Sequence, residues 1–168
     1  MTDGAPRVLV YGYGNPGRLD DGLGPALADR LAASGLHPGV TVETNYQLAV
    51  EDAATVAEHD VVVFADASIE GPDPFTFTRL IPRPEASFTT HVLPPEVLMA
   101  IAIEHFAAGA AGYLLAIRGH EFDEFGEHLS DRARENLGAA EAFLTELIRS
   151  GSFEASVTSN GDGPNGNG

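Results

Sequence analysis

The chain has 168 residues, 43% of them hydrophobic, which is enough for one domain with a buried core and too short for two ordinary domains. Nine Lys and Arg residues against 25 Asp and Glu give a formal net charge of −16, which opposes binding to nucleic acid and to anionic membrane surfaces. The absence of cysteine excludes disulfides, thiolate metal sites and a cysteine nucleophile. With neither long apolar runs nor signal-peptide features, we expect a soluble, cytoplasmic protein.

Short apolar segments alternate with segments of helical periodicity along the chain. Residues 7–13 and 61–66 are apolar runs typical of strands that are buried on both faces of a parallel sheet. The expected strands are 7–13, 40–44, 61–66, 75–81 and 112–118, and the expected helices are about 23–35, 50–58, 94–107 and 130–149. This alternation predicts an α/β sandwich of three layers, in which a mostly parallel sheet has helices on both faces.

The fourth strand and the end of the chain have different patterns. Residues 75–81 alternate apolar and polar side chains, which favours a half-exposed strand at an edge of the sheet. After Arg149 the apolar periodicity is lost, and residues 151–168 are rich in glycine, serine and asparagine. We expect a single α/β domain over residues 1–150 and a disordered tail over residues 151–168.

Three polar residues stand near the predicted carboxyl ends of strands. Asp21 lies in the loop after the first strand, Asp66 ends the strand 61–66, and His91 follows the edge strand. Ligands of parallel α/β sheets bind at this edge, so two carboxylates and an imidazole could converge there on a cation. Singly, each has an ordinary structural interpretation, such as a helix cap for Asp21.

The glycines of the first loop allow a second interpretation. Residues 12–17 spell G-x-G-x-x-G after a strand, and Glu43 ends the next strand, as in a dinucleotide-binding protein. However, the helix begins late, and Asp20 and Asp21 occupy the place of the phosphates. Their charges would oppose phosphate binding by roughly 1 kcal/mol each or more. We therefore expect no nucleotide cofactor.

Three parts of the sequence resemble the nickel-iron hydrogenase maturation endopeptidases. They are the segment from Val8 to Gly24, with G-x-G-N followed by an acidic pair and G-x-G, the run Val63-Phe64-Ala65-Asp66-Ala67, and a histidine at 91 ahead of a Pro-Glu helix. The likeness covers about residues 7–148. It implies a twisted five-stranded sheet between helices. It also implies that the protein removes a short C-terminal extension from a hydrogenase large subunit after nickel insertion.

The resemblance also implies a metal site. Its metal-binding positions, which we also expect to be the catalytic ones, fall on Asp21, Asp66 and His91. The first position is commonly Glu in the family, and the family often has a glycine-rich turn where this chain has residues 45–48. Carboxylates hold nickel less well than imidazole does, so this set would bind it loosely. Loose binding suits nickel that is carried by the substrate and serves as a recognition element.

Several roles stay open. The hydrolytic step could use a carbonyl polarised by the metal or a water activated by an acidic residue. Asp20 could be that base, although a structural role as a helix cap or loop brace is favoured. Residues 118–125 are a candidate substrate wall or a solvated acidic loop. The expected partner is the hydrogenase large-subunit precursor, and the protein is expected to be a monomer. A noncatalytic accessory protein that binds the same large subunit is the alternative from another class.

Overall fold

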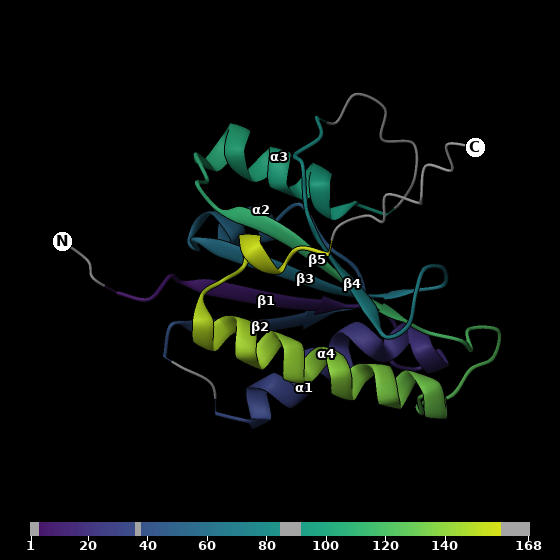
Figure 1. The fold of residues 1–168 in the computed structure, drawn as a ribbon. Helices are drawn as coiled ribbons and strands as arrows, with labels where there is room; N and C mark the ends of the chain where they lie inside the picture. Colours follow the sequence, from purple (N-terminus) through teal and green to yellow (C-terminus); the bar gives the residue numbers. More distant parts are fainter. Residues whose placement is uncertain (1–3, 36–37, 85–91, 159–168) are drawn as a thin grey trace, which may run out of the picture.

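The computed structural model describes residues 4–35, 38–84 and 92–158, whose strands form one five-stranded sheet in the order β2-β1-β3-β5-β4 (Figure 1). The strands are β1 (Val8–Tyr13), β2 (Val40–Asn45), β3 (Val61–Ser68), β4 (Phe75–Arg79) and β5 (Ala111–Arg118). All neighbouring pairs are parallel except β4 and β5. The predicted mostly parallel sheet is confirmed, as is the edge position of the fourth strand.

Helices cover both faces of the sheet, as predicted. Helices α1 (Leu23–Ala33) and α4 (Asp131–Ser150) lie on one face, and α2 (Asp52–Ala57) and α3 (Pro95–Phe106) lie on the other (Figure 1). A 3₁₀ turn, η1 (Leu19–Gly22), leads into α1, and a second, η2 (Glu154–Ser156), follows α4. None of the helices in the described ranges combines the length and apolarity needed to cross a bilayer.

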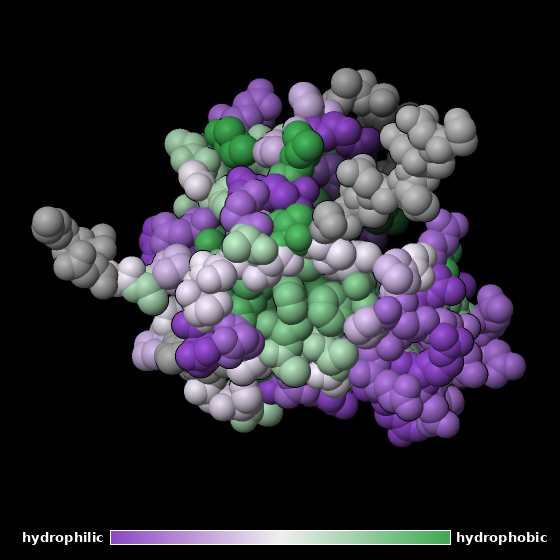
Figure 2. Space-filling view, viewed as in Figure 1, coloured by the Kyte–Doolittle hydropathy of each residue, from purple (hydrophilic) through white to green (hydrophobic). Residues whose placement is uncertain are grey.

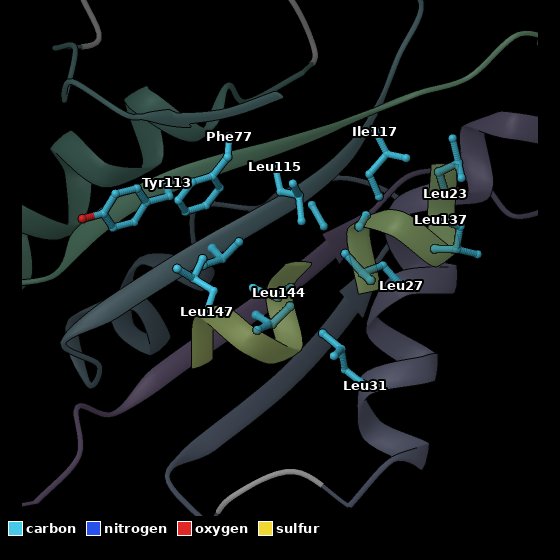
Figure 3. Close-up of a cluster of buried hydrophobic side chains, with 14 of the residues drawn as sticks. Leu23, Leu27, Leu31, Phe77, Tyr113, Leu115, Ile117, Leu137, Leu144 and Leu147 are labelled. Carbon is cyan, nitrogen blue, oxygen red and sulfur yellow. The ribbon is translucent and has the colours of Figure 1, made fainter. Parts of the chain in front are cut away.

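The larger core cluster lies between the sheet and helices α1 and α4. Its centre is shown in Figure 3, where Phe77 of β4 stacks on Tyr113 of β5 with ring centroids 5.0 Å apart. The leucines of α1 and α4 belong to the same cluster; they are Leu23, Leu27, Leu31, Leu137, Leu144 and Leu147. A second cluster fills the space between the sheet and α2 and α3. Burial on both faces explains why the central strands are continuous apolar runs.

The start of α1 lies directly against the sheet backbone. A Cβ atom on Gly24 would be 2.4 Å from the carbonyl oxygen of Ala65 and 2.5 Å from that of Tyr13. A Cβ atom on Gly12 would be 2.2 Å from the carbonyl oxygen of Gly24. Such distances are shorter than any van der Waals contact, so only glycine allows this approach. The approach places η1 over the carboxyl ends of β1 and β3.

Strand β3 is longer than its sequence predicts. The apolar run ends at Ala65, yet β3 continues to Ser68, and Asp66 pairs in register with Ala116 of β5. Asp66 therefore lies within the strand and does not end it. Hydrogen bonding to β5 continues the strand through residues whose polarity predicts a loop.

Residues 152–158 correct the predicted disordered tail. Phe153 is only 4% exposed and packs in the larger core cluster, and Glu154 accepts hydrogen bonds from Arg79 (2.8 Å) and from the Tyr113 hydroxyl (2.7 Å). Thr158 then pairs with Phe77 of β4 through two hydrogen bonds, of 2.7 Å and 3.0 Å. For these residues the prediction of disorder is wrong. The rest of the predicted tail, residues 159–168, lies outside the described residues.

Candidate active site

The loop between β1 and η1 is folded on itself by its own polar side chains. Asn15 accepts a hydrogen bond from the backbone N–H of Gly17 (2.9 Å), and its own N–H donates to Oδ2 of Asp21 (2.8 Å). Gly14 has a φ of 142°, and a Cβ atom there would lie 2.1 Å from the carbonyl oxygen of Asp21. Backbone geometry and hydrogen bonding thus fix Asp21 at the carboxyl edge of the sheet.

Asp66 lies on the sheet face that α2 and α3 cover, beside Tyr13 of β1. Tyr11 precedes Tyr13 by two residues on β1, and Phe64 precedes Asp66 by two residues on β3; both belong to the core cluster on that face. Because every second side chain of a strand points to the same face, Tyr13 and Asp66 lie on that face too. Burial raises the pKa of Asp66 to about 7, and the nearby charge of Asp21 raises it too. Hydrogen bonds from Ala67 and Tyr13 act in the opposite direction without overcoming burial. Asp66 is therefore close to half protonated at neutral pH.

The Tyr13 hydroxyl shares this environment. Burial raises its pKa, and the charge of Asp66 and the hydrogen bond between the two side chains raise it as well. Tyr13 is therefore a neutral donor to Asp66 throughout the physiological range. A cation bound to Asp66 would displace the proton and favour the carboxylate, which is how metal binding and pKa are coupled.

The structure brings together two of the three predicted site residues. Asp21 and Asp66 are electrostatically coupled across η1 and β3. His91 lies outside the described residues. Within residues 4–35, 38–84 and 92–158, no group of three or more Asp, Glu or His side chains is placed to hold a metal ion. The third ligand therefore stays a prediction.

Asp20, the neighbour of Asp21, is fully buried and holds three chain segments together. Its carboxylate accepts hydrogen bonds from the N–H groups of His120 (2.8 Å), Glu121 (2.9 Å) and Ser130 (2.8 Å), and from the Ser130 hydroxyl (2.7 Å). Burial by itself raises the pKa of Asp20, but these donors outweigh it and lower the pKa below the ordinary value. A carboxylate engaged in this way braces the loop, the role that the sequence favours for it.

An open cavity of about 490 Å³ adjoins Asp21. Its lining residues are Arg18, Asp21, Ile69, His120, Phe122 and Asp123. The guanidinium of Arg18 donates to the carbonyl oxygen of Phe122 (3.1 Å). This hydrogen bond joins the loop after β1 to the loop of residues 118–125 at the cavity. The loop of residues 118–125 thus lies beside Asp21, where a substrate wall is expected. Both polar and apolar side chains line this wall.

A polar cluster around Asp73, in the loop between β3 and β4, is not predicted by the sequence. Asp73 accepts hydrogen bonds from Nε2 of His120 (2.7 Å), the Asn136 amide (2.7 Å) and the Arg132 guanidinium (3.0 Å). One signal was available, because Asn136 stands among the apolar positions of the last helix and is only 6% exposed. A buried polar residue needs partners, which predicts a polar cluster but does not name its members.

Comparisons of the sequence with protein-family models and with curated proteins find no match. The structure, in contrast, is similar to several solved structures. HycI, a [NiFe] hydrogenase maturation protease from Thermococcus kodakarensis, is 23% identical with a TM-score of 0.70, over 88% of this chain and 95% of that one. The hydrogenase maturating endopeptidase HybD from E. coli is 20% identical with a TM-score of 0.63, over 86% and 93% of the two chains.

A third similar structure, an uncharacterized protein from Wolinella succinogenes, is 24% identical with a TM-score of 0.62, over 86% of this chain and 98% of that one. At these identities the likeness establishes the fold. The fold that the resemblance implies is therefore confirmed: the described part of the chain has the architecture of the hydrogenase maturation proteases.

Proposed function

We propose that this protein is an endopeptidase that removes the C-terminal extension of a nickel-iron hydrogenase large subunit. The observation that carries the proposal is the pair Asp21 and Asp66, two coupled carboxylates at the carboxyl edge of a sheet whose architecture is that of named maturation proteases. The position is the one at which open α/β sheets bind their ligands. Neither carboxylate is engaged in an ion pair within the described part of the chain.

The nickel in the substrate serves as the recognition element of the proposed reaction. Two carboxylates and, by the family resemblance, His91 form a ligand set that binds nickel weakly. The proton on Asp66 adds to this weakness, because the metal must displace it. A site of this kind engages nickel that other ligands of the substrate already hold. Cleavage would then follow only when nickel insertion has succeeded.

Asp20 is unsuited to be the base of the hydrolytic step. Its carboxylate is 0% exposed and is saturated by donors from His120, Glu121 and Ser130. A general base must reach the water from which it takes a proton. The attacking water must therefore be activated by the substrate's metal or by another side chain at the cavity.

The test is a cleavage assay that follows the intact mass of a nickel-loaded and of a nickel-free large-subunit precursor. We expect loss of a C-terminal peptide from the loaded precursor alone, and no loss with Asp21→Asn, Asp66→Asn or His91→Ala. Asp29→Asn, an exposed acid on α1, is the matched control and should cut at the wild-type rate. Equal cleavage of both precursors would refute the recognition role of nickel. Stable binding without shortening would identify a noncatalytic accessory protein.

A further inference from the structure

His120 is fixed at both its backbone and its side chain. Its backbone N–H donates to Asp20 (2.8 Å), and its ring Nε2 lies 2.7 Å from Oδ1 of Asp73. The imidazole is 17% exposed and lines the cavity that Asp21 also lines. A loop histidine held at two points is pre-organised in a way that an ordinary surface histidine is not.

Asp73 is itself locked in place. The Asn136 amide donates to it (2.7 Å) and also to the carbonyl oxygen of Arg118 (2.9 Å), which ties Asp73 to the end of β5. Arg132, in the first turn of α4, adds an ion pair at 3.0 Å, and Figure 2 shows that hydrophilic residues gather over this end of α4. The hydrogen bond from His120 has the largest effect on the pKa of Asp73 and the one from Asn136 the next largest; they lower it to about 2. Asp73 is therefore an ionised acceptor at any working pH.

The ionised carboxylate decides which ring nitrogen carries the proton. Because Asp73 can only accept, Nε2 of His120 must donate to it. In the neutral imidazole, Nδ1 then holds a free lone pair. No hydrogen bond to Nδ1 is formed within residues 4–35, 38–84 and 92–158. An orienting carboxylate, a fixed tautomer and a free nitrogen on a ring that lines a cavity are the attributes of a general base.

We propose that His120, oriented by Asp73, is a catalytic residue of the peptide hydrolysis. This inference rests on the proposed function. As the water oxygen bonds to the scissile carbonyl carbon, one water proton passes to Nδ1 of His120. When the carbon–nitrogen bond of the tetrahedral intermediate breaks, the same proton passes from Nδ1 to the leaving nitrogen. The products are a carboxylic acid and an amine, and His120 returns to its neutral form.

The competing interpretation is that His120 only braces the loop through Asp73. Two substitutions separate the interpretations. In His120→Gln the amide nitrogen occupies the place of Nε2 and can still donate to Asp73, but the basic Nδ1 is lost. In His120→Asn an amide group occupies the place of Nδ1, the contact with Asp73 is lost, and no basic nitrogen remains. A brace needs only the contact that Gln preserves.

The experiment measures thermal stability, affinity for the nickel-loaded precursor and the rate of cleavage under single-turnover conditions at saturating enzyme. For His120→Gln we expect wild-type stability and affinity, and a cleavage rate at least about 100-fold lower, the usual contribution of a positioned general base. A folded His120→Gln that cuts within threefold of the wild-type rate overturns the inference and leaves the proposed function intact. If His120→Gln does not fold, His120→Asn is measured instead. A folded His120→Asn that cuts within threefold of the wild-type rate overturns the inference, and one that binds the loaded precursor with wild-type affinity but cuts at least about 100-fold more slowly supports it. A wild-type protein that binds and never cuts overturns the proposed function, and this inference with it.

Discussion

The carboxylate of Asp21 raises the pKa of Asp66, although Asp21 lies on the 3₁₀ turn η1 and Asp66 within strand β3. Gly12 of β1 and Gly24 of α1 make this proximity possible, because they let the start of α1 touch the backbone of β1 and β3. Two carboxylates in one partly buried site repel each other. The folded chain therefore maintains an unfavourable arrangement that a cation would relieve.

The first prediction concerns the titration of Asp66. Its carboxyl should titrate near pH 7 in a ¹³C NMR experiment. Asp21→Asn removes a like charge and should lower this pKa, whereas Tyr13→Phe removes a donor to the carboxylate and should raise it. Tyr46→Phe, at an exposed position, is the control and should leave it unchanged. A pKa that does not respond to Asp21→Asn would contradict the coupling.

The second prediction concerns stability. Because the folded pKa of Asp66 is about 7 and its ordinary value is 3.8, the folded state loses stability as the pH rises from about 4 through about 7. Asp66→Asn should therefore raise the free energy of unfolding at pH 8, by roughly 2 kcal/mol, and change it little at pH 4. Urea denaturation at the two pH values measures the difference. An equal effect at both values would show that the gain does not come from the buried charge.

The third prediction concerns Asp20. In Asp20→Asn an amide NH₂ group replaces one carboxylate oxygen. This hydrogen-bond donor would face the backbone N–H groups that donate to the wild-type carboxylate. We expect the free energy of unfolding at pH 7 to fall by about 3 kcal/mol. Since the folded pKa is lowered, the wild-type advantage should disappear as the pH falls through that folded pKa. Asp29→Asn, at an exposed position on α1, should change stability by less than about 0.5 kcal/mol.

The fourth prediction contrasts two glycines in helices. A methyl group on Gly24 would lie 2.4 Å from the Ala65 carbonyl oxygen, so Gly24→Ala must displace α1 from the sheet and should destabilise the protein by more than about 2 kcal/mol. Gly138, inside α4, has no atom within 4 Å of an added Cβ. Gly138→Ala should therefore stabilise the protein by roughly 0.5 to 1 kcal/mol. Thermal denaturation of both variants measures the contrast, and a loss of stability in both would count against this packing.

The fifth prediction contrasts two phenylalanines. Phe153, after α4, is 4% exposed, whereas Phe125, in the loop before α4, is 89% exposed. Phe153→Ala should lower the free energy of unfolding by about 3 kcal/mol, and Phe125→Ala by less than about 0.5 kcal/mol. If Phe153→Ala proved as mild as Phe125→Ala in urea denaturation, the segment after α4 would not contribute to the core.

The sequence predicts the architecture well because local patterns determine it. Continuous apolar runs identify strands buried on both faces, and the helical spacing of Leu23, Leu27 and Leu31 identifies the first helix. The positions of Asp21 and Asp66 at one edge follow from parallel topology alone. These inferences need no knowledge of which distant residues meet.

Contacts between distant segments account for what the sequence does not predict. His120 and Asp73 form a contact although they are 47 positions apart in the sequence, and Phe77 and Thr158 do so although they are 81 positions apart. Neither pairing leaves a periodic signal, and serine- and glycine-rich composition around Phe153 is typical of disorder even though that side chain is buried. Tertiary packing overrides composition at that point.

The pairing of Thr158 with Phe77 has a consequence for association between molecules. Edge strands carry backbone groups that can recruit a strand from a neighbouring chain, and this is a common route to aggregation. Here the N–H and C=O groups of Phe77, in the middle of β4, are already engaged by the protein's own Thr158. A foreign strand could join the sheet at β4 only after displacing this segment, so the residues that follow α4 also oppose fibrous self-assembly.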